Sequence, residues 1–206
     1  MTTEASATAR RNTRLTPERE MELYTAVVEL LREVGYEALT MDAVATRTRS
    51  SKATLYRQWK GKPELVATAL RACKPVRAEE VDTGSIVTDL YELARGVPEH
   101  KDQDATAVMQ ALAHAAVRNP DLGNALREAL VEPENAALHR MLDRAVERGE
   151  IPRGRPAIDF MIFMMTGAFF GRPLIEDRAV DAEFLRSYID AVVLPALGVT
   201  VPPVSR

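Results

Sequence analysis

The spacing of apolar residues predicts a helix near the start of the chain. Between residues 17 and 34, apolar side chains recur three and four positions apart, which places them on one face of a helix. Thr16, Pro17 and Glu18 supply its start: a capping side chain, a proline in the first turn and an acid near the positive end of the helix dipole. Gly35 ends it. The apolar face consists of Met21, Tyr24, Val27, Val28, Leu31 and Val34.

The same periodicity predicts eight further helices. Thr40 caps a short one, Ser50 or Ser51 caps the next, and Pro75 stops the fourth. Pro133 is expected to kink the longest of them. No run alternates between apolar and polar residues as a half-buried strand would, so we predict an all-α protein of about nine helices. The eight ranges are 40–48, 52–59, 62–73, 85–96, 103–119, 121–150, 157–170 and 181–198.

The composition fits a helical core in a reducing compartment. Of the 206 residues, 46% are hydrophobic but only 5% are aromatic. The core is therefore expected to consist of Ala, Leu, Val, Ile and Met, which favour helices over strands. One cysteine, Cys73, forms neither an internal disulfide nor a Cys-X-X-Cys zinc site. Residues 1–14 have no apolar run, so we expect a disordered arm rather than a secretory signal, and a cytoplasmic protein.

Positive charge gathers at the N-terminal end of an acidic chain. Residues 1–62 hold 11 Lys and Arg against 8 Asp and Glu, whereas the remainder holds 16 against 22. The segment SSKATLYRQWKGK, residues 50–62, has four basic residues, two aromatic residues and no acid. We call the basic N-terminal part the head and the acidic remainder the body. This distribution suggests that the head binds an anion, although the charge alone is weak evidence for nucleic acid.

The order of elements around this segment predicts DNA binding. A short helix, a tight turn and a second short helix form the helix-turn-helix arrangement. Leu55 and Trp59, four residues apart, would hold the second helix against the first two. Its opposite face would then offer Lys and Arg donors to base edges in the major groove, with hydroxyl groups for phosphates.

Residues 35–66, GYEALTMDAVATRTRSSKATLYRQWKGKPELV, resemble the DNA-binding head of the tetracycline-repressor (TetR) family of bacterial transcription regulators. The resemblance covers roughly 45 residues, counting the first helix. Two positions depart from the family pattern. Arg49 stands where a turn glycine is frequent, and Ser50 stands where a small apolar residue is frequent. A left-handed Arg49 would cost about 1–2 kcal/mol, but this residue could also contact phosphate. The residues that carry the resemblance are Gly35, Tyr36, Thr40, Val44, Ala45, Ser51, Lys52, Ala53, Thr54, Leu55, Tyr56, Trp59 and Lys62.

The resemblance implies which residues of the head contact phosphate and which contact bases. Thr40, Tyr56 and Lys62 are expected to bind phosphate, with help from Ser50 or Ser51. Lys52, Ala53 and Arg57 are expected to approach bases, with Thr54 and Gln58 at the edge. The family also implies a homodimer formed through helices near the C-terminus, and a small-molecule effector that changes operator binding. We therefore predict a DNA-binding domain at residues 1–74 and a ligand-binding and dimerisation domain at 75–206.

The body offers candidate ligand contacts beside candidate dimer contacts. The segment FMIFMMTGAFFG, residues 160–171, is apolar on most sides and must be buried. It is core or dimer interface on one interpretation and a pocket wall on the other, and 157–170 with 181–198 would make a four-helix dimer seam. The ligand-binding candidates are Tyr91, Met109, Gln110, Ala113, His114, Phe160, Phe163 and Met164.

Other classes of function find little support in the sequence. The most apolar run, 158–175, is interrupted by Gly167, Gly171 and Arg172 and falls short of the roughly 20 apolar residues of a membrane span, so we expect a buried helix and no membrane partner. No phosphate loop, nucleophile motif or metal-ligand cluster is present, so we expect neither an enzyme nor a cofactor.

Three short sequence features each allow two interpretations. Arg10, Arg11 and Arg14 are a minor-groove arm or a disordered tail. Arg153-Gly154-Arg155-Pro156 is an ordinary loop or a short minor-groove binder, and Cys73 is a packed thiol or a redox sensor. The sequence as a whole predicts a ligand-responsive transcriptional repressor. The alternative is a helical small-molecule-binding or scaffold dimer without sequence-specific DNA recognition.

Overall fold

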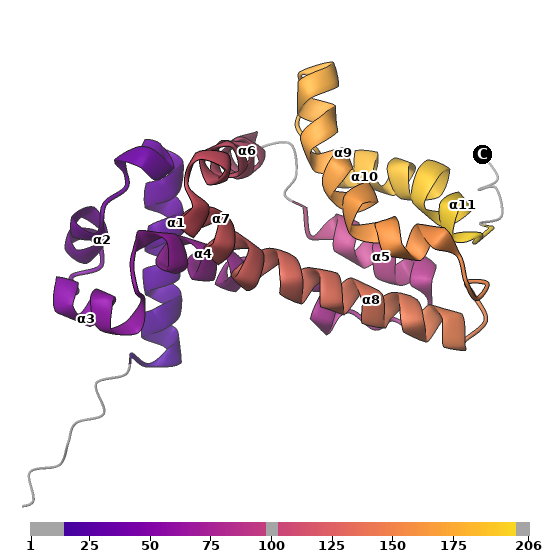
Figure 1. The fold of residues 1–206 in the computed structure, drawn as a ribbon, viewed down its shortest axis with the longest axis horizontal. Helices are drawn as coiled ribbons and strands as arrows, with labels where there is room; N and C mark the ends of the chain where they lie inside the picture. Colours follow the sequence, from indigo (N-terminus) through magenta and orange to yellow (C-terminus); the bar gives the residue numbers. More distant parts are fainter. Residues whose placement is uncertain (1–14, 98–102, 201–206) are drawn as a thin grey trace, which may run out of the picture.

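The computed structural model describes residues 15–97 and 103–200, and these residues form helices, turns and loops without a strand (Figure 1). Two π-helical turns, Arg127–Val131 and Ile189–Val193, join α7 to α8 and α10 to α11, so the described ranges contain nine continuous helices. The predicted all-α fold is confirmed. The helices are α1 (Pro17–Ala38), α2 (Met41–Arg47), α3 (Lys52–Gln58), α4 (Lys62–Ala72), α5 (Ile86–Arg95), α6 (Gln103–Arg118), α7 (Pro120–Leu126), α8 (Glu132–Glu147), α9 (Met161–Glu176), α10 (Ala182–Tyr188) and α11 (Leu194–Leu197).

The helix starts follow from capping side chains. The Thr16 hydroxyl accepts from the Arg19 amide at 3.3 Å, and the Ser51 hydroxyl accepts from the Thr54 amide at 3.1 Å. The backbone leaves helical geometry at Gly35, with φ 74°, so the first helix is interrupted where it was predicted to end. Asn119 caps α7 in the same way, a signal that the sequence carried but our prediction did not use.

The longest helix changes its winding rather than simply kinking at Pro133. The π turn Arg127–Val131 lies just before this proline. Pro133 has no N–H to donate to the carbonyl of Ala129, four residues earlier. That carbonyl instead accepts a hydrogen bond from Nη1 of Arg71 in α4, at 3.1 Å. A side chain from a distant segment therefore compensates for the missing backbone donor.

The buried residues form two cores. One is formed by residues of α5, α8, α9, α10 and α11, and we call it the body core. The other fills the head, and it includes Leu112 and Ala115 of α6 and Leu122 of α7. Figure 1 shows α6 beside α1 and away from α5, and α6 contacts α1. The boundary predicted at residues 74 and 75 therefore does not separate the two cores, because α6 and α7 pack with the head.

Helix α9 is less buried than its apolar sequence predicts. Met161, Ala168 and Arg172 are buried, whereas Phe163 is 69% exposed and Leu174 is 86% exposed. The stretch also runs on past residue 170. Pro156–Glu176 is the one helical stretch in the described residues that is long and apolar enough to cross a membrane, judged by length and composition alone, and one such helix is weak evidence. The expectation that the run is too short to span a membrane is therefore wrong by length and composition. Burial of the helix is seen only in part within one chain, and the dimer interface expected for its remaining apolar face stays a prediction.

Candidate nucleic-acid interface

The turn between α2 and α3 is a Schellman motif. The Arg49 amide donates to the Thr46 carbonyl at 3.3 Å, and the Ser50 amide donates to the Ala45 carbonyl at 2.9 Å. This closure needs a left-handed residue, and Arg49 takes that place with φ 51°. The predicted strain at Arg49 is therefore present. Arg19 of α1 also donates to the Thr48 carbonyl, a support for the turn that the sequence did not reveal.

Helix α3 is held against the head by one apolar face. Leu55 is fully buried and Trp59 is 4% exposed, as their spacing predicted. The Trp59 ring meets the Tyr24 ring edge-on, with centroids 5.8 Å apart. Burial raises the pKa of the Tyr24 hydroxyl. With this face fixed, the remaining faces of α3 can present a defined surface.

The opposite side of α3 is exposed. Lys52, Ala53, Tyr56 and Arg57 are all exposed, and Tyr56 retains 54% of its accessible surface. The Lys52 ammonium pairs with Asp42 of α2 across the turn. Arg and Lys at such positions are the donors that read guanine edges and bind phosphate. The structure thus brings four of the ten predicted DNA contacts onto one surface.

Four predicted contacts at the edges of this surface have structural partners. The Thr40 hydroxyl caps α2 by accepting from the Ala43 amide at 3.2 Å. Ser51 caps α3, and its hydroxyl lies 2.8 Å from that of Thr54, which is half-buried. Ser50 is half-buried, and its hydroxyl is 3.4 Å from the Thr48 carbonyl. Capped helix N-termini can also offer backbone N–H groups to phosphate.

Lys62 and Gln58 point toward the head itself. The Lys62 ammonium donates to the Tyr36 carbonyl at 2.8 Å and lies 4.2 Å from the centroid of the Tyr36 ring. The Gln58 amide donates to the Glu20 carboxylate of α1 at 2.7 Å. Gln58 is therefore oriented by α1, and Lys62 by the residue that follows Gly35.

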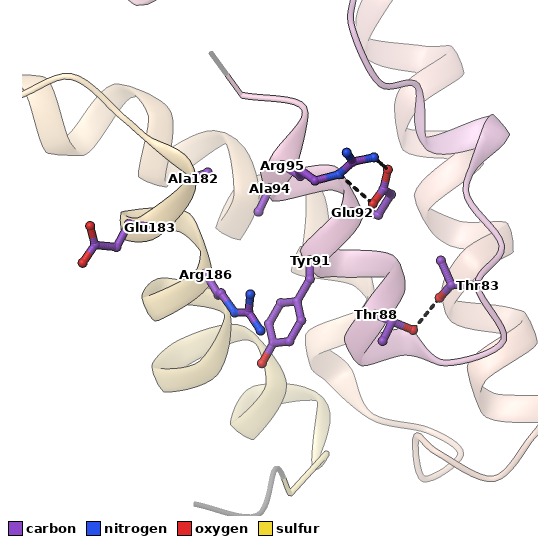
Figure 2. Close-up of a pocket in the computed structure, with 9 residues that line it drawn as sticks. All are labelled: Thr83, Thr88, Tyr91, Glu92, Ala94, Arg95, Ala182, Glu183 and Arg186. Atoms are coloured by element: carbon purple, nitrogen blue, oxygen red, sulfur yellow. Dashed lines mark hydrogen bonds and ion pairs between the residues drawn. The ribbon is translucent and has the colours of Figure 1, made fainter. Parts of the chain in front are cut away.

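The predicted ligand contacts lie in three separate places. Tyr91 lines a cavity of about 560 Å³ between α5 and α10, with Arg95, Thr83 and Arg186 (Figure 2). The Tyr91 hydroxyl donates to the Asp190 carboxylate, and the Arg186 guanidinium lies 4.2 Å from the centroid of the Tyr91 ring. Burial is the largest cause that raises the pKa of Tyr91, followed by its hydrogen bond to Asp190.

The other seven candidates lie outside this lining. Met109 and His114 are exposed on α6, Gln110 and Ala113 are half-buried there, and α6 packs on the head. Phe160 and Phe163 are exposed at the start of α9, their ring centroids 6.3 Å apart, while Met164 packs against the body core. The four candidates on α6 lie apart from Tyr91 because α6 packs on the head. The periodicity of a sequence indicates which face of a helix is apolar, but not which neighbour that face meets.

The structure also shows the surroundings of Cys73 and of the loop at residues 153–156. Cys73 is half-buried, and burial raises the pKa of its thiol, which opposes the thiolate that a redox sensor needs. The loop at residues 153–156 is exposed, and the Arg155 guanidinium lies close to Gly198 at the end of α11. Within the described residues, no group of three or more His, Cys, Asp or Glu side chains could hold a metal ion. The N-terminal Arg10, Arg11 and Arg14 lie outside the described residues.

Comparisons with known proteins assign the family. The family model described as "Bacterial regulatory proteins, tetR family" matches residues 23–69, and "Tetracyclin repressor-like, C-terminal domain" matches residues 80–192. The chain belongs to the TetR family of DNA-binding transcriptional regulators.

Individual relatives are similar to this chain over most of its length and of their own. An uncharacterized HTH-type transcriptional regulator of Mycobacterium tuberculosis is 34% identical, over 87% of this chain and 88% of its own. A DNA-binding transcriptional repressor TetR of Mycobacteroides abscessus is 31% identical, over 85% of this chain and 92% of its own. The crystal structure of the TetR family transcription regulator SCO0332 superimposes with a TM-score of 0.66 at 28% identity, covering 90% of this chain and all of the other.

Proposed function

We propose that this protein is a dimeric transcriptional repressor that inserts α3 into the major groove of an operator. The observation that carries the proposal is the pair of opposite faces on α3. Leu55 and Trp59 are buried in the head, while Lys52, Tyr56 and Arg57 are exposed on the other side. Lys52 and Arg57 would read bases, and Tyr56 would bind phosphate together with Thr40. The repressor activity is supported by the name of the M. abscessus relative.

The same proposal includes a homodimer formed through α9 and the α10–α11 helix. Phe163, Leu174 and Ile175 expose apolar surface along α9, and Val192 exposes more on the π turn between α10 and α11. Burying this surface against a second copy would supply hydrophobic stabilisation in proportion to its area. Two heads joined in this way would meet two half-sites of a palindromic operator.

An effector would act on the spacing of the two heads. The cavity between α5 and α10 offers room for a small molecule, and Arg186 and Arg95 give it two guanidinium groups. A small molecule held there would contact the helix that we assign to the dimer seam. Because the head packs with α6 and α7, a shift in the body can reach α3 through shared packing. We place this activity in the cytoplasm, where the operator would be.

Selection of bound sequences from a random duplex pool tests the proposal. The protein is incubated at about 150 mM salt with competitor DNA, so that weak phosphate attraction is screened. Enrichment of a palindrome with half-sites one or more helical turns apart is expected, and the Lys52→Ala/Arg57→Ala variant should lose it. Glu132→Ala, an exposed position on α8, serves as the control. Binding without enrichment of any sequence would favour the scaffold alternative instead.

A further inference from the structure

One acidic residue lies within the segment that would meet DNA. Residues 40–62 hold six Lys and Arg residues but a single acid, Asp42. Asp42 is exposed in the first turn of α2, and its carboxylate pairs with the Lys52 ammonium at the start of α3. Lys52 is one of the residues that we expect to read bases. The one negative charge of this segment therefore contacts a side chain assigned to sequence recognition.

This ion pair is exposed to solvent. The Lys52 side chain is 58% exposed and the Asp42 side chain is 61% exposed. Exposed ion pairs contribute little to folding stability, because water and salt screen both charges. An acid in the first turn also stabilises its helix through the dipole, but that effect needs no partner on the next helix. DNA can compete with so weak a pair, so its effect should appear in DNA binding rather than in folding.

An ammonium group can keep this partner and still read a base. Lysine has three N–H donors at the end of a flexible four-carbon stem. One donor can remain on Asp42 while another reaches the O6 or N7 acceptor of guanine in the major groove. Without Asp42, the same stem can carry the ammonium to a phosphate, which is present at every nucleotide and carries no sequence information.

We propose that Asp42 is a positioning residue for sequence recognition. It holds the Lys52 ammonium between α2 and α3, where the ammonium can donate to base edges, and it keeps the ammonium from phosphates. Binding that ignores sequence is weakened as a result, and the preference for the operator over other DNA increases. This inference rests on the proposed function, because it needs Lys52 to read bases.

Binding to a scrambled duplex tests the restraint on phosphate contact. Asp42→Asn removes the charge and keeps the size of the side chain. It should raise affinity for this duplex about two to five times for each bound head, the range for an exposed charge pair. The dependence of log affinity on log salt should steepen by about one unit for each head, because Lys52 then displaces a counterion. Unchanged affinity and slope would overturn the proposal.

Two further variants show whether Asp42 acts through Lys52. In a Lys52→Met background, Asp42→Asn should raise affinity and slope less than it does alone, because no ammonium remains to be released. Equal gains in both backgrounds would mean that the carboxylate only repels phosphate, which contradicts the positioning role. Glu132→Gln removes an exposed acid from the first turn of α8 and should change neither quantity. Thermal unfolding confirms that each variant is folded, and Asp42→Ser removes the same charge if Asp42→Asn does not fold.

The effect on recognition needs the operator. In selection from the random duplex pool, Asp42→Asn should lose preference at one base pair of each half-site, while Glu132→Gln should keep it. If Asp42→Asn selects the same palindrome with the same preference at every position, the positioning role fails and the proposed function stands. If the native protein selects no palindrome, the proposed function fails. The scrambled duplex then still decides whether Asp42 keeps Lys52 from phosphates.

Discussion

Nη1 of Arg71 donates to the carbonyl of Ala129 at 3.1 Å, which joins the last turns of α4 to the π turn before α8. The carbonyl is available because Pro133 offers no N–H to it. Nη2 of Arg71 also pairs with Glu79 at 3.1 Å. A single side chain therefore connects the helix that leaves the head, the segment that enters the body and the longest helix.

Arg71→Ala should lower the free energy of unfolding by about 1–2 kcal/mol, because a charged donor to a carbonyl is lost along with a half-exposed ion pair. Urea unfolding measures the change. In a Pro133→Ala background the backbone donor is restored, so the same substitution should cost less. Glu79→Ala removes the ion pair alone. Equal costs of Arg71→Ala in both backgrounds would contradict the role given to Pro133.

Arg49→Gly should stabilise the protein by about 0.5–1 kcal/mol. Arg49 has a left-handed backbone, with φ 51°, and glycine adopts this conformation without strain. The strain energy that is removed should exceed the entropic cost of ordering a more flexible glycine. Arg49→Ala is the matched control, because it removes the guanidinium but keeps the strain. If Arg49 also contacts phosphate, both variants should weaken DNA binding and flatten its salt dependence by about one unit. A Gly variant no more stable than the Ala variant would show that the turn tolerates Arg49 without strain.

Local signals made the head predictable. Thr40 and Ser51 cap the helices that follow them, and Leu55 and Trp59 define a buried face, because each relation spans only a few residues. The docking of α6 on the head could not be predicted in this way. Leu112 and Ala115 indicate an apolar face, but the same face could have met α5. Gln58 likewise has the type and position of a base contact, and only the fold shows that Glu20 lies within reach.

Arg57→Ala should relax sequence preference and cost about 1–3 kcal/mol on the selected operator, because a guanidinium that reads a base cannot be replaced by water without loss. Lys62→Ala is the contrast. It should weaken all duplexes alike and flatten the salt slope by about one unit. Competition binding against operator and scrambled duplexes at several salt concentrations separates these effects. A uniform loss with Arg57→Ala would make Arg57 a phosphate contact, and an unchanged slope with Lys62→Ala would remove Lys62 from that group.

Cys73 should react slowly with iodoacetamide. Burial raises the pKa of its thiol above the ordinary value of 9.0, so the thiolate fraction at each pH falls below that of a free cysteine. The alkylation rate should therefore rise to its plateau at a higher pH in the folded protein than in the urea-unfolded chain. Mass spectrometry of quenched samples gives both profiles. A folded-state profile shifted to lower pH would favour the redox-sensor interpretation.

A buried ion pair joins α9 to the start of α10, the two helices that we assign to the dimer seam. Nη1 of Arg172 lies 3.1 Å from the Asp181 carboxylate, and the guanidinium lies 4.1 Å from the centroid of the Phe184 ring. The other carboxylate oxygen accepts from the Phe184 amide at 2.7 Å and caps α10. Both side chains are less than a tenth exposed. Nε of Arg172 also lies 3.4 Å from the half-exposed Glu176 carboxylate, so losing Asp181 would leave the buried guanidinium with this weaker partner alone.

Asp181→Asn should therefore cost about 3 kcal/mol, the low end for a broken buried pair, because Glu176 stays beside the guanidinium and Asn retains the capping oxygen. Combining it with Arg172→Met should recover much of that loss, because an apolar side chain of similar length replaces the poorly compensated charge. Urea unfolding at one fixed protein concentration measures stability, and sedimentation velocity reports the dimer. We expect the double variant to be nearly as stable as the native protein but a weaker dimer, since Met sets the angle between α9 and α10 less firmly. A double variant that dimerises as tightly as the native protein would show that hydrophobic packing alone sets this angle.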